Sequence, residues 1–565
     1  VPVNFLTQLL KKAKAGEWEV LWTEANATCH RKAAKECTQP RPQEDAIKDR
    51  VLALVEEGQL SKACKALDAA GLHDVRKALE SKHPVSGPLP PPATPTPPSL
   101  SLKKEDIIRA LGGFRTGTAP GASRFRVSHF LDALSIPTGD SDGRLSRPLT
   151  QVCNTLVRGE APPSIAHWIS GAPLFPLKKK DGGVRPIAVG EVLRRLVSRA
   201  CCAAVREKAD AHFLPLGQVG VGVRGGAEAA VQAVRCSLVS RGSDDFVVLK
   251  IDLENAFNAG SRTVILEEVE RHFPELTAWF RYCYGQPAVL TCQGEVLSFG
   301  SSTGVQQGDP LGPFLFSLSL TRCCSRLKET LSAEALSVWY LDDGTIAGPS
   351  AEVRKAWDII REETTRGGYR VNLSKCELFS PNPTLLSAFP PEFVRLPSQG
   401  FELLGSPIGT DTFCESYVKK RVARIRNAIE GLSLIEDPQV ELLLLKGCLG
   451  FPKFGFALRS APTAQIEPAV REFDGIIDAA AQDHFGLSLS PSQAVQWHLP
   501  VPLGGVGIVR AGDVANAAYL GNALSSLPIV RQLLGRDIPF QDLPGVQASL
   551  SALRTQVSSS EVLPA

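Results

Sequence analysis

The chain has 565 residues, of which 43% are hydrophobic and 21% are charged, and its formal net charge is +3. This length and apolar content can build several hydrophobic cores, which excludes a small module held together by disulfides or a metal. The small net charge excludes a strongly basic or acidic protein, so a nucleic-acid-binding surface has to be sought in local clusters of charge.

The cysteines and the apolar segments bear on the cellular compartment. The 14 cysteines are scattered without a repeating spacing, and no secretory signal precedes them, so we expect free thiols in a reducing compartment. No segment approaches the roughly 18 apolar residues that a membrane helix needs. We therefore expect a soluble intracellular protein. The chain begins at Val1 and contains no methionine, which indicates an incomplete sequence.

The first hundred residues divide into two regions. Residues 1–83 are expected to be helical, because apolar residues such as Ile47, Val51 and Leu54 recur at helical spacing. A proline-rich stretch follows, PVSGPLPPPATPTPPS, in which proline removes backbone donors and favours extended polyproline II. This stretch predicts a linker over residues 84–100. A docking motif for an aromatic-lined domain is the alternative.

Two strand-like segments in the middle of the chain carry acidic residues at their ends. FVVLKID ends at Asp252, and SVWYLDDGTIAG has two strand-like arms around Asp342 and Asp343. The first is typical of a buried strand and the second of a short hairpin. Taken separately, the acids can be a helix N-cap and two turn formers. Taken together, they suit hard divalent cations, which take oxygen ligands and are paired about 4 Å apart in phosphoryl-transfer sites.

Two other segments are locally basic and could bind phosphates. Between residues 178 and 206, basic residues far outnumber acidic ones, and residues 419–426 place basic side chains over two turns of an expected helix. A solvated helix surface would look similar. The candidates for nucleic-acid binding are Arg194, Arg195, Lys419, Lys420 and Arg424.

Five sequence blocks occur in one order between Leu102 and Gly409: KKKDGGVRPI, KIDLENAFN, TGVQQGDPLGPFLF, YLDD, and GYRVNLSKCELF together with LLGSPIG. In this order they resemble the fingers hairpin and the palm motifs of reverse transcriptases, most closely those of non-LTR retrotransposons. The chain departs from the family pattern at Asn258, Gln306 and Gly312, where many relatives have Asp, Arg and Ser.

The resemblance implies an α+β fold of the right-hand polymerase type. Its parts would be fingers with a template-binding extension over residues 101–245, an antiparallel-sheet palm over residues 246–410, and a helical thumb and C-terminal region over residues 411–565. A helical N-terminal region would precede them.

The resemblance also assigns a metal site. Asp252 and Asp342 would bind two Mg²⁺ ions, with Mn²⁺ as an alternative, and the backbone carbonyl of Leu253 would complete one shell. Asp343 would bind less directly. No separate protein nucleophile is required.

Residues around the incoming nucleotide follow from the same motifs. Phe257 stands where the family has an aromatic side chain that blocks a ribose 2′-hydroxyl, although a core phenylalanine after the strand is the alternative. Asp309 is expected to cap the next helix rather than to act as a fourth catalytic acid. Further nucleotide contacts are expected from Lys180, Arg185, Gln307, Gly308 and Lys375, although lysines of this kind can also be plain surface residues.

We therefore expect an RNA-directed DNA polymerase of a retrotransposon, with an RNA template, a DNA primer and deoxynucleoside triphosphates as partners and no membrane. The family resemblance places it in the nucleus and cytoplasm. A catalytically silent RNA-binding descendant is the alternative function, and the intact acids argue against it. An RNA-making polymerase is disfavoured by the bulky Phe257.

Overall fold

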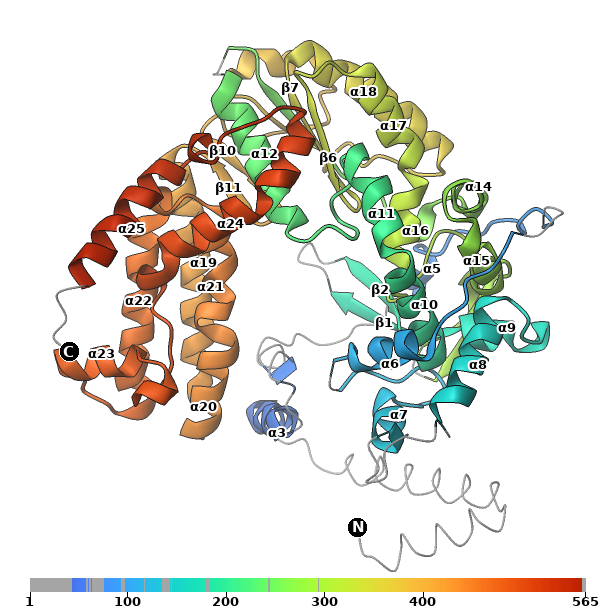
Figure 1. Cartoon of the computed structure of the whole chain (residues 1–565), viewed down its shortest axis with the longest axis horizontal. Helices are drawn as coiled ribbons and strands as arrows, with labels where there is room; N and C mark the ends of the chain where they lie inside the picture. Colours follow the sequence, from blue (N-terminus) through green and yellow to red (C-terminus); the bar gives the residue numbers. More distant parts are fainter. Residues whose placement is uncertain are drawn as a thin grey trace, which may run out of the picture.

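The computed structural model describes residues 43–56, 59, 62–63, 76–92, 97–115, 117–134, 143, 145–178, 183–241, 244–292 and 294–560. These residues form an arch in which two helix-rich limbs are joined by a β-sheet and its covering helices (Figure 1). One limb, blue to green, comes from the N-terminal half, and the orange-to-red limb comes from the C-terminal helices. No helix in the described ranges is both long and apolar enough to cross a bilayer.

The sheet that joins the limbs has the strand order β6-β7-β3-β8-β9. Strand β3 pairs antiparallel with β7 and β8, β6 forms a hairpin with β7, and β9 lies parallel to β8. Both strand-like segments predicted from the sequence are therefore present. The strands are β3 (Val247–Ile251), β6 (Leu336–Tyr340), β7 (Asp343–Gly348), β8 (Glu377–Phe379) and β9 (Val394–Arg395).

Strand β3 is covered on both faces, which explains its unbroken apolar sequence. Val247, Leu249 and Ile251 belong to one core and Val248 to another, because successive side chains of a strand point to opposite faces. The first core includes α14 (Arg262–His272), α16 (Gly312–Ser319), α17 (Thr321–Thr330) and α18 (Ser350–Arg366). The second includes α12 (Gly226–Arg241) and α24 (Ala511–Leu534). Helices from the predicted fingers and from the C-terminal region thus both cover this sheet.

The N-terminal limb contains a second sheet with the order β2-β1-β4-β5. Strands β1 (Ala172–Lys178) and β2 (Val184–Ala188) form the predicted hairpin, and β1 pairs in parallel with β4 (Ala288–Cys292), the partner of β5 (Glu295–Ser301). The helices of this limb are α6 (Lys104–Gly112), α7 (Val127–Leu134), α8 (Ser146–Val157), α9 (Pro163–Ser170), α10 (Val192–Ala204), α11 (Arg206–Phe213) and α15 (Thr277–Tyr284).

The C-terminal limb is helical, as expected, and follows a hairpin of β10 (Gly400–Leu403) and β11 (Ser406–Gly409). Its first helix, α19 (Asp411–Glu430), buries a stripe of residues three and four positions apart in the limb's own core. The stripe is Cys414, Val418, Val422, Ile425 and Ile429. The other helices are α20 (Pro438–Leu444), α21 (Phe451–Ser460), α22 (Thr463–Phe485), α23 (Pro491–His498) and α25 (Val546–Ser560).

The described part of the N-terminal region contacts both limbs. Val51 of α3 (Gln43–Glu56) lies in the core of the C-terminal limb, whereas Leu79 of α5 (Arg76–Glu80) lies in the core of the second sheet. The start of the predicted linker is also packed: the hydroxyl of Ser302 donates to the carbonyl of Pro84 at 3.0 Å, and Arg281 donates to the carbonyl of Pro90 at 2.7 Å.

Candidate functional site

Three carboxylates meet at one edge of the joining sheet. Ile251 pairs with Gly344, so Asp252 follows β3 directly opposite Asp343, the first residue of β7. Tyr340 pairs with Asp343 across the hairpin, which leaves Leu341 and Asp342 as the two residues of the turn. The antiparallel register therefore brings together acids that are about ninety positions apart in the sequence.

The charges at this edge interact. Loss of water around the carboxyl group of Asp343, together with the charge of Asp342 and more weakly that of Asp252, raises the pKa of Asp343 to about 6. Lys250 and Arg185 act in the opposite direction. Lys250 lies on β3 and forms an ion pair with Glu377, whereas Arg185 is an exposed residue of the hairpin strand β2. The positive charge of Arg185 on the fingers hairpin thus acts weakly on Asp343.

The backbone beside Asp252 is held by the segment that precedes β8. The carbonyl of Asp252 accepts a hydrogen bond from the amide of Asn372 at 2.9 Å, and the amide of Glu254 donates to the carbonyl of Arg370 at 2.8 Å. Lys375 is exposed on this same segment, three residues beyond Asn372. The predicted Lys375 is therefore brought close to the main chain that carries Asp252.

Phe257 follows the acid on a short helix, α13 (Ala256–Ala259), which begins after Asn255 in a left-handed conformation. Its ring is half-buried and stacks on Phe316 with centroids 4.9 Å apart. The carbonyl of Phe257 accepts a hydrogen bond from the amide of Val305 at 2.6 Å. This hydrogen bond connects Phe257, which is predicted to block a ribose 2′-hydroxyl, to the loop that contains Gln307.

The loop with Gln307 and Gly308 packs against the fingers hairpin. The amide of Ala188, at the end of β2, donates to the carbonyl of Gln307 at 2.7 Å. Gly308 is required here: its φ is +130°, and a Cβ atom would lie 2.1 Å from the carbonyl oxygen of Ala188. The structure therefore brings Gln307, Gly308 and the strand of Arg185 together. Lys180 lies outside the described residues.

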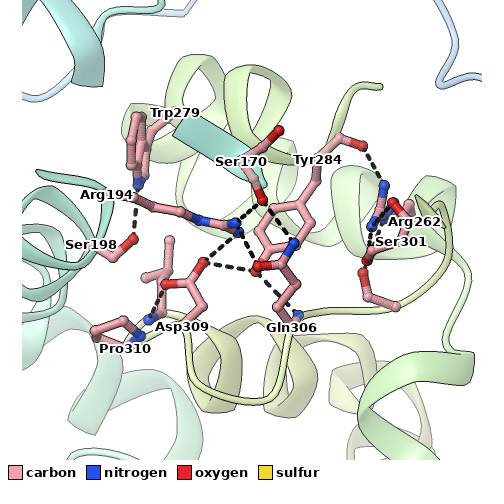
Figure 2. A network of polar contacts seen from close by, with 12 residues as sticks. Ser170, Arg194, Ser198, Arg262, Trp279, Tyr284, Ser301, Gln306, Asp309 and Pro310 are labelled. Atoms are coloured by element: carbon pink, nitrogen blue, oxygen red, sulfur yellow. Dashed lines mark hydrogen bonds and ion pairs between the residues drawn. The ribbon is translucent and has the colours of Figure 1, made fainter. Parts of the chain in front are cut away.

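A buried polar network anchors this loop to neighbouring helices (Figure 2). Arg194 donates to Asp309 at 2.9 Å, to Gln306 at 2.6 Å and to the carbonyl of Ser170 at 2.6 Å. The hydroxyl of Tyr284 also donates to Asp309, at 2.8 Å. Asp309 accepts from the amide of Leu311 at 3.0 Å in the turn before α16, but the N-cap residue of that helix is Leu311, so Asp309 stabilises the turn instead of capping the helix as predicted.

The predicted nucleic-acid contacts Arg194 and Arg195 are corrected by the structure. Arg194 is completely buried and forms an ion pair with Asp309, so its guanidinium cannot reach a phosphate on the surface. Arg195 is also buried and donates to the carbonyl of Ala119 at 2.6 Å. Both residues lie on α10, which has buried residues on all of its faces. The two arginines therefore form hydrogen bonds inside the protein and stabilise its interior.

The basic residues predicted on the C-terminal limb do lie on its surface. Lys419, Lys420 and Arg424 are exposed on α19, away from the buried stripe of that helix. The amine of Lys419 is 2.6 Å from a carboxylate oxygen of Glu415, four residues earlier. Lys420 and Arg424 are therefore the stronger candidates for contact with a phosphate backbone.

Residues that the sequence analysis missed hold the backbone of the site. Arg262 donates to the carbonyls of Gly304, Tyr284 and Ser301 at distances between 2.9 and 3.0 Å (Figure 2). Gln218 donates to and accepts from the backbone of Leu341. Glycines at 217 and 220 were the sequence signal for close backbone packing around Gln218.

The donor set fits a hard divalent cation. In the described part of the chain, no group of three or more His, Cys, Asp or Glu side chains is placed so that it could hold a metal ion by itself. Mg²⁺ in phosphoryl-transfer sites is held by one or two carboxylates, while substrate phosphates and water supply the remaining oxygens. Loss of water raises the pKa of Asp343 most, and the charges of Asp342 and Asp252 raise it further; a bound cation would offset that repulsion.

These features define a right-hand polymerase fold, with the fingers hairpin, a palm sheet that carries acids at its edge, and a helical thumb. Residues 177–408 match the family reverse transcriptase (RNA-dependent DNA polymerase). That part of the chain is similar to reverse transcriptase domains, and the resemblance and the α+β polymerase fold expected from the motifs are confirmed.

One relative is the retrotransposable element SLACS 132 kDa protein of Trypanosoma brucei gambiense. It is 26% identical over 442 residues, which cover 76% of this chain and 35% of the relative. The chain thus spans about a third of that protein's length. The match agrees with the resemblance to reverse transcriptases of non-LTR retrotransposons that the motifs indicated.

Solved structures that resemble the chain include two yeast telomerases. Apo telomerase from Candida tropicalis is 12% identical with a TM-score of 0.37, and 70% of this chain and 66% of that chain are covered. Telomerase from Candida albicans with a fragment of telomeric RNA is also 12% identical, with a TM-score of 0.33 and coverages of 67% and 66%.

Proposed function

We propose that this chain extends a DNA primer on an RNA template by adding deoxynucleotides. The observation that carries the proposal is the meeting of Asp252 and the Asp342–Asp343 hairpin at one sheet edge, with the charge of Arg185 acting on it from the fingers. Oxygen ligands on one side and a cation on the other suit a nucleoside triphosphate with its metal ions.

Asp252 and Asp342, with the carbonyl of Leu253, are the residues that would hold two Mg²⁺ ions, and Asp343 would add negative charge beside them. Such ions lower the pKa of the primer 3′-hydroxyl and neutralise charge on the triphosphate. The protein's own contribution is positioning: the sheet register fixes the acids, and the Gln307 loop and Arg185 surround the nucleotide.

Sugar selection is assigned to Phe257. Its stacking on Phe316 limits the movement of the ring, and a rigid aromatic side chain beside the acids would exclude a ribose 2′-hydroxyl. The exposed Lys420 and Arg424 of α19 would contact the phosphate backbone of the template–primer duplex. Residence in the nucleus and cytoplasm stays a prediction.

The test is primer extension with Mg²⁺ on an RNA template, comparing wild type with Asp252→Asn and Asp342→Asn. Both substitutions remove a metal-binding charge with little change in shape, so we expect a loss of at least about a hundredfold in extension rate. Asp358→Asn, on the exposed surface of α18, is the matched control and should extend normally. If wild type binds RNA but extends no primer on any template, the silent RNA-binding alternative is correct.

A further inference from the structure

The chain between α11 and α12 runs along β6, the edge strand of the β6–β7 hairpin that carries Asp342 and Asp343 (Figure 1). The amide of Trp339 donates to the carbonyl of Gly217 at 2.8 Å, and the amide of Val219 donates to the carbonyl of Trp339 at 2.8 Å. A Cβ atom at Gly217 would lie 2.3 Å from the carbonyl oxygen of Ser337. The glycine therefore permits an approach that another residue would prevent.

The side chain of Gln218 lies between this segment and the turn of the hairpin. It is 1% exposed. Its oxygen accepts from the amide of Leu341 at 2.9 Å and from the amide of Gly220 at 3.0 Å, and its nitrogen donates to the carbonyl of Leu341 at 3.2 Å. A single buried amide thus binds both backbone groups of Leu341.

Leu341 is in a conformation that needs such support. Its φ is +57°, in the left-handed region, and it is the first of the two turn residues. Two-residue hairpin turns with positive φ at this position usually have glycine there, and a branched side chain persists only where its surroundings impose the conformation. The next residue is Asp342, so the backbone of Leu341 sets the direction in which that carboxylate leaves the turn.

We propose that Gln218 is a positioning residue that fixes the backbone of Leu341 and so aims the carboxylate of Asp342 at the metal site. The inference rests on the proposed function. Catalytic groups must be held within a fraction of an ångström, and supporting hydrogen bonds provide that precision. Gln218 touches neither nucleotide nor metal, and acts through the turn.

The variant that tests the proposal is Gln218→Leu, which keeps the apolar bulk and removes all three hydrogen bonds. The matched control is Gln232→Leu. Gln232 is also completely buried, but it donates to the hydroxyl of Tyr519 at 3.0 Å and faces α24 instead of the hairpin. Both variants lose a buried amide and should lose comparable thermal stability, so stability alone does not decide the question.

Two readouts separate positioning from general stability, and neither requires catalysis. Hydrogen–deuterium exchange of the peptide that contains Leu341 should be at least about tenfold faster in Gln218→Leu and unchanged in Gln232→Leu. Binding of Mn²⁺, measured by electron paramagnetic resonance, should weaken several-fold in Gln218→Leu alone. In primer extension, kcat should fall roughly tenfold to a hundredfold with little change in KM for the nucleotide.

The outcomes distinguish this proposal from the proposed function. If Gln218→Leu matches Gln232→Leu in exchange at the turn and in Mn²⁺ affinity, the positioning role is wrong, whatever the activity. If wild type extends no primer, the polymerase proposal fails, while exchange and Mn²⁺ binding still decide whether Gln218 aims the turn.

Discussion

The guanidinium of Arg194 and the carboxylate of Asp309 form an ion pair at 2.9 Å in which each side chain is only 1% exposed. Removing one partner of such a pair leaves an uncompensated buried charge, which costs about 3–5 kcal/mol. We expect Asp309→Ala to lower the free energy of unfolding by about this amount in urea titrations. Glu275→Ala, which breaks the exposed pair with Lys208, should cost less than about 1 kcal/mol. Equal costs would contradict the structural role of the buried pair.

Phe257→Val tests the assignment of sugar selection. The smaller side chain should admit ribonucleotides, so the ratio of kcat/KM for deoxy- over ribonucleotides should fall by about tenfold or more. The control is Phe280→Val, a fully buried core position in the same cluster, which should reduce stability and leave that ratio unchanged. Unchanged sugar discrimination in Phe257→Val would make this residue an ordinary core phenylalanine.

Asp343 links the stability of the metal-free protein to pH. Its pKa is raised in the folded state, from 3.8 to about 6, so the folded state binds this proton more tightly than the unfolded chain. The resulting stability is present below about pH 4 and is lost as the pH rises through 6. In EDTA we therefore expect Asp343→Asn to raise Tm by ~1–2 °C at pH 7.5 and to have little effect at pH 4.

The control for the pH experiment is Asp358→Asn, which makes the same change of charge on the exposed surface of α18. Its effect on Tm should not follow the same pH profile. A difference between wild type and Asp343→Asn that stays constant from pH 4 to pH 7.5 would show that the Asp343 carboxyl does not titrate in this range.

We expect the exposed basic residues of α19 to contribute to the salt dependence of nucleic-acid binding. Replacing Lys420 and Arg424 together by glutamine should weaken binding of an RNA–DNA duplex and reduce the slope of log K against log salt by about 2. Arg361→Gln, on the exposed face of α18, should leave the slope unchanged. If the double variant keeps the slope of wild type, the duplex does not lie along this face of α19.

The sequence by itself predicted the acidic residues of the candidate site and determined the type of fold. The strand before Asp252 and the hairpin around Asp342 and Asp343 are local patterns, because alternation, β-branching and turn residues act between near neighbours. The order of five motifs then identified the polymerase class. The basic residues of α19 were likewise visible in the sequence, as basic side chains over two turns of an expected helix.

The tertiary structure decided which polar residues face solvent and which support the site. Arg194 lies in a basic segment, but its partner Asp309 is 115 residues away, and nothing local distinguishes a phosphate-binding arginine from a buried one. Gln218 and Leu341 are 123 positions apart. Burial and hydrogen-bond partners at such separations depend on how the elements pack, and a local sequence pattern carries no information about them.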